Sequence, residues 1–181
     1  MERLAIIGCG AMGHSIALSA AWRGVQVKMY GINSADTEQG KSGIYAKLET
    51  LLQSRLLNAS ASEQIKQRIV TTDSIEEAVG DSSFVIEAIP ENIDLKKDLF
   101  RRLDNICGRD VILASNTSGL NPSALASVTR FPERVVTAHF WNPAHLMPLV
   151  EVVRGKKTAD DTVKRTMDLL RVMKKKPIEV K

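Results

Sequence analysis

The feature that most constrains the fold of this chain lies within its first thirteen residues. A short apolar run, residues 3–7, leads directly into Gly8-Cys9-Gly10-Ala11-Met12-Gly13, which fits the pattern G-x-G-x-x-G. This pattern is typical of a buried strand that turns sharply into a helix, because glycine tolerates the tight turn and lets the helix approach the strand closely. The sequence therefore predicts a strand, a glycine turn and a helix over residues 11–23.

The same turn predicts a binding site for the pyrophosphate of a dinucleotide. Gly8 permits the turn, Gly10 lets the backbone approach the phosphates, and Gly13 lets the helix pack on the strand. A helix that begins at Ala11 and Met12 directs free N–H groups and the positive end of its dipole toward that anion. We expect all five residues to contact the cofactor.

Strands and helices alternate along the rest of the chain. Further strands are expected at residues 26–30, 69–71, 84–86, 111–114, 135–139, 149–153 and 177–180. Further helices are expected at residues 35–57, 75–79, 93–106 and 159–173, with a short helical stretch that ends at residue 68. This alternation predicts an α/β fold, a Rossmann-type, doubly wound and mainly parallel sheet with helices on both faces. We expect residues 1–181 to form one dinucleotide-binding domain.

Local signals refine these helices. Side chains suited to N-caps stand before three of them, at Ser34, Ser74 and Thr158. The helix over residues 93–106 is expected to bury an apolar stripe made of Leu95, Leu99, Leu103 and Ile106.

Composition excludes several classes of function. The chain has 181 residues, 44% of them apolar, without a run long enough to span a membrane, and its net charge is only +4. The basic cluster Lys174-Lys175-Lys176 is interpreted as a solvated helix end, so neither nucleic acid nor membrane is expected as a partner. Cys9 and Cys107 show no metal-ligand or disulfide pattern, which predicts no metal site and a reducing, cytoplasmic location.

The turn after residues 26–30 departs from the usual pattern. Such folds place an acidic residue there, whose carboxylate accepts hydrogen bonds from the adenosine ribose, but this chain has Gly31. Residues 32–34 can donate hydrogen bonds but supply no negative charge, and Lys28 is the nearest cation in sequence. Losing a charge-assisted bond should cost about 1.5–3 kcal/mol. We expect NAD as the cofactor, with Gly31 beside it. NADP is an alternative, because a turn without an acidic residue could accept a 2′-phosphate.

Three polar side chains reach one edge of the expected sheet from separate segments: Ser118, His139 and Glu151. Histidine accepts a proton near neutral pH, and a carboxylate on its other ring nitrogen would fix the tautomer and stabilise the imidazolium. Ser118 would then bond the substrate oxygen that loses its proton. Each residue also has a purely structural explanation. The rival interpretation, a serine hydrolase, lacks the G-x-S-x-G elbow.

Several motifs, in order, resemble the L-3-hydroxyacyl-CoA dehydrogenases, and specifically their N-terminal NAD-binding domain. They are residues 8–13, residues 85–92 with Lys96 and Phe100 following, residues 114–118, and residues 139–143 leading to residues 149–152. The resemblance implies NAD-dependent oxidation of the 3-hydroxyl of a 3-hydroxyacyl-CoA to the 3-ketoacyl-CoA, in fatty acid metabolism.

The same resemblance implies roles for single residues. His139 would be the general base, Glu151 its partner, and Ser118 a contact to substrate and nicotinamide. Further cofactor contacts would be Glu91, Lys96, Asn116 and Asn142.

The chain departs from the family pattern at other positions. Gly31 replaces the ribose-binding aspartate, and Lys47 and Ser54 stand where the family carries a CoA-contacting serine and lysine. Trp141 and His145 resemble relatives that act on free hydroxy acids, such as gulonate or carnitine dehydrogenases. Two alternatives therefore stay open: a dehydrogenase of a free hydroxy acid, and a dinucleotide-binding module without catalysis.

The family pattern continues beyond residue 181 into a helical domain that completes the substrate cleft and forms the dimer. We expect residues 1–181 alone to fold and bind cofactor but to turn over poorly, and to form a homodimer only together with such a domain.

Overall fold

A computed structural model describes residues 2–180. Its strands are β1 (Arg3–Ile7), β2 (Gln26–Tyr30), β3 (Ile69–Thr72), β4 (Phe84–Glu87), β5 (Ile112–Ser115), β6 (Val135–Phe140), β7 (Leu149–Arg154) and β8 (Lys176–Val180). Its α-helices are α1 (Ala11–Trp22), α2 (Ser34–Gln53), α3 (Ala59–Gln67), α4 (Ile75–Val79), α5 (Ile93–Ile106), α6 (Pro122–Ala126) and α7 (Asp160–Val172).

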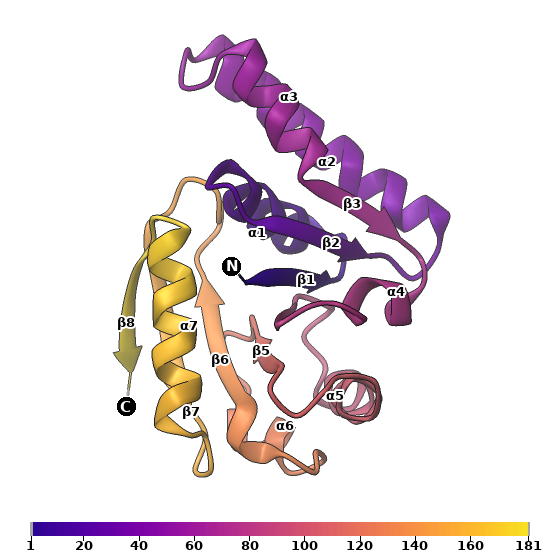
Figure 1. Cartoon of the computed structure of the whole chain (residues 1–181), viewed down its shortest axis with the longest axis vertical. Helices are drawn as coiled ribbons and strands as arrows, with labels where there is room; N and C mark the ends of the chain where they lie inside the picture. The colour runs from indigo at the N-terminus through magenta and orange to yellow at the C-terminus, as the bar shows by residue number, and fades with distance from the viewer. Residues whose placement is uncertain (1, 181) are drawn as a thin grey trace.

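The strands form one sheet in the order β3-β2-β1-β4-β5-β6-β7-β8 (Figure 1). The pairs from β3 to β6 are parallel, β7 runs antiparallel to β6, and β8 is parallel to β7. The predicted doubly wound, mainly parallel fold is confirmed. The order of strands reverses between β1 and β4, and in such sheets ligands bind outside the carboxyl ends of the strands at this position.

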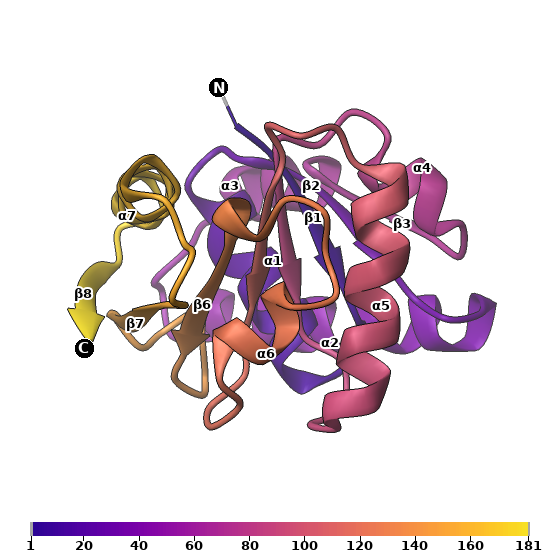
Figure 2. The same cartoon turned by 90° about the horizontal axis from the view of Figure 1, so that it is seen from below.

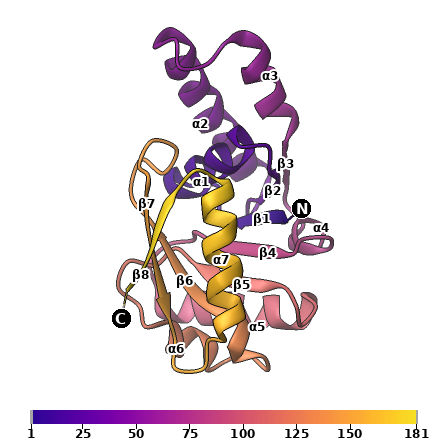
Figure 3. The same cartoon turned by 60° about the vertical axis from the view of Figure 1, so that its left-hand side comes forward.

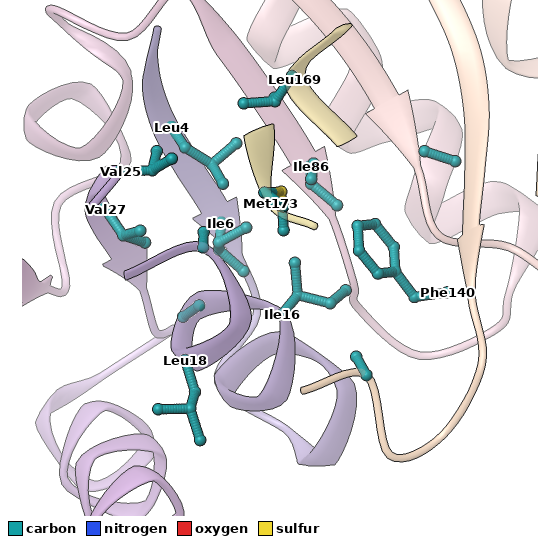
Figure 4. Packing of buried hydrophobic residues seen from close by; sticks show 14 of the residues in the cluster. Leu4, Ile6, Ile16, Leu18, Val25, Val27, Ile86, Phe140, Leu169 and Met173 are labelled. Carbon is teal, nitrogen blue, oxygen red and sulfur yellow. The ribbon is translucent and has the colours of Figure 1, made fainter. Parts of the chain in front are cut away.

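Side chains alternate across β1 and supply two separate cores. Leu4 and Ile6 pack with Ile16 of α1 and Leu169 of α7 on one face (Figure 4). The alternate residues of β1 belong to a second cluster with Phe100 of α5, and Figure 2 shows α5 and α6 next to each other on that face. Because both faces are covered, the central strands are apolar throughout, as expected for parallel strands.

Helices α2 and α3 lie side by side near the β3 edge of the sheet (Figure 3). The predicted N-cap Ser34 is wrong: Asn33 caps α2 by accepting a hydrogen bond from the Asp36 N–H at 2.9 Å. The helix ends at Gln53 rather than residue 57, and Arg55 takes a positive φ of 57° in the connection to α3. An asparagine thus begins the helix one residue earlier than the serine would.

The other two predicted N-caps have opposite outcomes. Ser74 caps α4, because its Oγ accepts a hydrogen bond from the Glu77 N–H at 3.3 Å. Thr158 does not cap α7: its hydroxyl donates to the Val135 carbonyl at 2.6 Å and accepts from the Gly155 N–H at 2.8 Å. These two hydrogen bonds hold the turn before α7 against β6.

The buried stripe of α5 is shifted from the prediction. Leu103 is fully buried, but Leu95 is 52% exposed, and Lys96 and Phe100 turn inward instead. The assignment of Leu95 to the core is therefore wrong. The neighbouring Lys96 takes the inward position because its partner, Glu87, is buried.

The interpretation of Lys174-Lys175-Lys176 as a solvated helix end is wrong for Lys175. This residue is buried, and its ammonium group donates to the backbone carbonyls of Ala144 at 2.5 Å and Met147 at 3.0 Å. Burial lowers the pKa of Lys175 to about 8. The side chain therefore ties the end of α7 to the loop between β6 and β7.

Two further searches cover residues 2–180. Within that range, no helix has the length and apolar character to cross a membrane. The same residues contain no cluster of three or more His, Cys, Asp or Glu side chains arranged to hold a metal ion.

Candidate active site

The glycine turn joins β1 to α1 and leaves space in front of the helix. Gly8 has a φ of +114°, and a Cβ on Gly13 would lie only 1.8 Å from the Gly8 carbonyl oxygen. A Cβ on Gly10 would meet nothing within 4 Å. Gly8 and Gly13 are thus required by the backbone, whereas Gly10 keeps open the space outside the turn.

That open space fits the pyrophosphate of a dinucleotide. Gly10 is the N-cap residue of α1 and offers no side chain to the first helical turn. The N–H groups at the beginning of a helix need acceptors and carry the positive end of the helix dipole, which suits a phosphate. The turn therefore leaves the first N–H groups of α1 without a side-chain cap and keeps the space beside Gly10 open.

Two adjoining cavities follow the carboxyl edge of the sheet from this turn. One has a volume of about 520 Å³, and the other, of about 340 Å³, includes Thr137, Glu151 and Val153 in its lining. Ser118 and His139 line both cavities. The larger cavity brings together seven residues that were predicted from the sequence: Met12, Glu91, Lys96, Asn116, Ser118, His139 and Asn142.

His139 and Glu151 face each other across an antiparallel strand pair. They are register partners on β6 and β7, so their side chains lie on the same face of the sheet. The distance from His139 Nδ1 to Glu151 Oε2 is 2.8 Å, which confirms the predicted contact. Because a carboxylate only accepts, Nδ1 carries the proton and Nε2 is left as the ring's acceptor.

The site is partly open, and an aromatic ring borders it. The side chains of His139 and Glu151 are 19% and 29% exposed. The ring of Trp141 lies 5.6 Å from the ring of His139, measured between centroids. A small molecule can therefore reach the imidazole, with the Trp141 ring beside it.

Ser118, in the loop after β5, lines the same cavities as His139. Within the described residues 2–180, these two side chains form no hydrogen bond with each other. The Asn116 side chain accepts a hydrogen bond from the Phe140 N–H at 2.9 Å, which ties this loop to the end of β6. Thr117 Oγ donates to Glu91. The arrangement suits a serine that contacts a substrate, and it lacks the serine–histidine contact that the rival hydrolase mechanism needs.

A buried ion pair between Glu87 and Lys96 lies beside the larger cavity. Glu87 is fully buried at the end of β4, and its Oε1 lies 2.5 Å from Lys96 Nζ. The same ammonium group lies 3.2 Å from Glu91 Oε2 and donates to the Ile89 carbonyl at 3.2 Å. The three donors of Lys96 are therefore all used within the protein, so it positions the loop as well as lining the cavity.

Glu87 is the member of this network that sequence reasoning missed. The strand expected at residues 84–86 stops one residue short of Glu87, which ends β4 and also accepts hydrogen bonds from Ser115 Oγ at 2.5 Å and the Ile89 N–H at 2.8 Å. Burial raises the pKa of Glu87, and the ammonium of Lys96 acts against that shift. Burial acts in the same sense on Glu91, but the hydrogen bonds from Thr117 and Lys96 bring the pKa of Glu91 below its ordinary value. A carboxylate directly after an apolar strand, with a lysine on the next helix, was the available signal.

Comparison with known proteins agrees with this geometry. A family profile described as "3-hydroxyacyl-CoA dehydrogenase, NAD binding domain" matches residues 3–181. This chain belongs to that family. The resemblance found in the sequence is confirmed.

Individual relatives of the dehydrogenase family match almost the whole chain. A 5-formyl-3-hydroxy-2-methylpyridine 4-carboxylate 5-dehydrogenase from Mesorhizobium japonicum is 38% identical over 100% of this chain and 58% of its own length. A probable 3-hydroxybutyryl-CoA dehydrogenase from Bacillus subtilis is 37% identical over 99% of this chain and 62% of its own length. The crystal structure of (S)-3-hydroxybutyryl-CoA dehydrogenase from Ralstonia eutropha matches with a TM-score of 0.96 at 34% identity, over 99% of this chain and 63% of that one. The chain thus spans about three fifths of these relatives.

Three residues expected from the sequence to depart from the family pattern lie on or near α2 or against α1. Lys47, on α2, lies with its Nζ 2.7 Å from His14 Nε2. Ser54 follows the last residue of α2 as its C-cap. His145 Nδ1 lies 2.9 Å from Ser15 Oγ. Lys47 thus pairs with His14 and His145 with Ser15, and neither of the two cavities includes these residues or Ser54 in its lining.

Lys28, the cation nearest in sequence to Gly31, is paired elsewhere in the structure. Lys28 donates to the Asp81 carboxylate at 2.9 Å and to the Glu77 carbonyl at 3.3 Å. Its ammonium group is therefore engaged on the α4 side of the sheet. The Lys28 ammonium group is therefore not free to pair with a 2′-phosphate at Gly31.

Proposed function

We propose that this chain carries the cofactor site and the proton acceptor of a dehydrogenase that oxidises the 3-hydroxyl of a 3-hydroxyacyl-CoA to the 3-ketoacyl-CoA. The observation that carries the proposal is the 2.8 Å contact between His139 Nδ1 and Glu151 Oε2, beside a cavity that extends to the glycine turn. Relatives named for 3-hydroxybutyryl-CoA oxidation and the family description support the same assignment.

The residues divide the chemistry between them. NAD, when bound, supplies a two-electron acceptor for the hydride that leaves substrate C3. The backbone N–H groups after Gly10 would hold its pyrophosphate. His139 Nε2 takes the hydroxyl proton, while the Glu151 carboxylate stabilises the imidazolium that forms. Ser118 hydrogen-bonds the substrate oxygen as it becomes a carbonyl.

The proposal also includes the identity of the cofactor and the cellular compartment. The family description supports NAD, and the pairing of Lys28 with Asp81 argues against the NADP alternative. Two buried, unpaired thiols at Cys9 and Cys107 support a reducing compartment such as the cytoplasm. We also propose that residues 1–181 act as the dinucleotide-binding domain, and that a homodimer requires a further helical domain, in line with the greater length of the relatives.

The test is a single-turnover measurement with the protein in excess over NADH and with acetoacetyl-CoA as oxidised substrate. Replacing His139 by Gln should lower the rate of NADH oxidation by about 10²–10⁴-fold, the usual contribution of a general acid or base, and leave NADH affinity unchanged. His145→Asn, which lies outside both cavities, is the matched control and should keep the rate.

Three results would contradict the proposal in different ways. An unchanged rate in His139→Gln would remove His139 from the chemistry. Turnover of gulonate or carnitine without turnover of 3-hydroxybutyryl-CoA would overturn the substrate assignment. Cofactor binding without any turnover, even when a helical partner domain is supplied, would indicate a non-catalytic module.

A further inference from the structure

The turn that follows β2 has no room for a side chain at position 31. A Cβ on Gly31 would lie 2.8 Å from Thr37 Cγ2, 2.9 Å from Thr37 N and 3.1 Å from Asp36 Oδ2. The first turn of α2 therefore occupies the space into which an acidic side chain at the end of β2 would project. One of the atoms that fill this space is itself a carboxylate oxygen.

Asp36 is held in that place by its own helix. Its N–H donates to Asn33 Oδ1 at 2.9 Å, and its Oδ2 accepts a hydrogen bond from the Ile32 N–H at 3.0 Å. These two bonds fix both the backbone and one carboxylate oxygen at the end of β2. The side chain is only partly buried, so a ligand can approach the carboxylate.

The face of α2 that carries Asp36 lies against the glycine turn. Gly40 is one helical turn further along, and a Cβ there would lie 3.2 Å from Cys9 Sγ. Burial, with the negative charge of Asp36 as the second cause, raises the pKa of the Cys9 thiol to about 12. The Gly8 N–H donates to the Tyr30 carbonyl at 2.9 Å. The carboxylate thus lies at the end of β2, on a helix that packs against the glycine turn.

We propose that Asp36 takes over the role of the strand-end acid, accepting hydrogen bonds from the adenosine ribose hydroxyls and making the site selective for NAD over NADP. This inference rests on the proposed function, which includes a dinucleotide at the glycine turn. A 2′-phosphate would be repelled by the carboxylate, and it would find the Ile32 N–H already bonded to Asp36. Lys41, on the same helix, is paired with Glu38 at 2.6 Å.

The competing explanation is that Asp36 only stabilises the start of α2. The substitution Asp36→Asn distinguishes the two, because the amide oxygen can still accept from the Ile32 N–H while the charge is lost. We expect the wild-type chain to bind NADH more tightly than NADPH in calorimetric titrations. In Asp36→Asn, NADH affinity should fall about tenfold and NADPH affinity should stay equal or rise, because a charge-assisted hydrogen bond and a repulsion are both removed.

A matched control separates stability from recognition. Asn58 caps α3 by accepting from the Ala61 N–H at 2.8 Å, so Asn58→Ala removes a cap without altering the turn after β2. It should lower the melting temperature and leave the NADH to NADPH affinity ratio unchanged.

The outcomes separate this inference from the proposed function. NADH binding that is equal in wild type and Asp36→Asn, with only the melting temperature lowered, would reduce Asp36 to a helix-stabilising residue and leave the proposed function intact. A wild-type preference for NADPH would also overturn the inference. Failure of the wild-type chain to bind either cofactor would contradict both.

Discussion

In the proposed mechanism Glu151 acts on the reacting atoms only through His139, so its replacement tests orientation and charge separately from proton transfer. We expect Glu151→Gln to lower the single-turnover rate at least tenfold, because a charge-assisted hydrogen bond worth about 1.5–3 kcal/mol is lost. NADH affinity should not change. Glu179→Gln on β8, where the carboxylate bonds Arg154 at 2.6 Å, makes the same substitution outside the His139 contact and should keep the rate. Equal losses in both variants would speak against a specific role for Glu151.

His145 should make the stability of the fold depend on pH. Burial, with the charges of Lys47 and Lys175, lowers the pKa of His145 from 6.5 to about 4. Between these two values the unfolded chain binds more protons than the folded one, so stability falls as the pH falls from about 6.5 toward 4. The melting temperature should therefore drop less over this window in His145→Asn than in the wild type. Parallel pH dependence in the two proteins would contradict the assignment.

At the scale of elements, one buried ion pair joins β4 to α5. Lys96→Met should destabilise the fold by about 3–5 kcal/mol in urea unfolding, because it leaves the Glu87 carboxylate buried without its counter-charge. Adding Glu87→Gln should recover part of this loss, since the amide can keep a hydrogen bond to Ser115. A double variant as unstable as Lys96→Met would show that the unpaired charge is not the cause.

Two glycines of the β1–α1 turn should respond differently to alanine. Gly13→Ala places a methyl group 1.8 Å from the Gly8 carbonyl oxygen, so it should lower the melting temperature strongly by forcing α1 away from β1. Gly10→Ala meets no atom within 4 Å and should leave the melting temperature nearly unchanged. It should nevertheless weaken NADH binding, because the methyl group enters the space proposed for the pyrophosphate. Unchanged NADH affinity in Gly10→Ala would place the phosphates elsewhere.

The same scale shows where sequence periodicity succeeds and fails. The limits of α5 are as predicted, and Leu103 is buried, because the spacing of apolar residues reflects the helix itself. Leu95 is exposed and Lys96 buried because the partner of Lys96, Glu87, belongs to a different element. Helical periodicity treats every lysine as a surface residue and cannot include such a partner.

At the scale of the whole molecule, the site is assembled at one edge of the sheet from five segments that are distant in sequence. The glycine turn and the ends of β4, β5, β6 and β7 all contribute residues to the two cavities. The parallel order of β1, β4, β5 and β6 places their carboxyl ends together, and the antiparallel β7 returns Glu151 to His139.

Steady-state turnover by residues 1–181 should be slow. The His139 and Glu151 side chains are 19% and 29% exposed in the structure of residues 2–180. We expect NADH to bind but 3-hydroxybutyryl-CoA to be oxidised far more slowly than by a relative of full length, because water is not excluded from the site. A rate comparable with that of the Bacillus subtilis relative, measured side by side, would contradict this expectation.

The sequence by itself determined the strand–turn–helix unit at residues 3–22, the alternation of strands and helices, and the segments that carry Ser118, His139 and Glu151. These features depend on local stereochemistry and on the periods of strands and helices, which are written in neighbouring residues. Only the tertiary structure decided that Lys96 and Lys175 are buried and that the Asp36 carboxylate occupies the space beside Gly31. Each of these placements depends on packing against another element, because burying a polar group is favourable only where the fold supplies its partner.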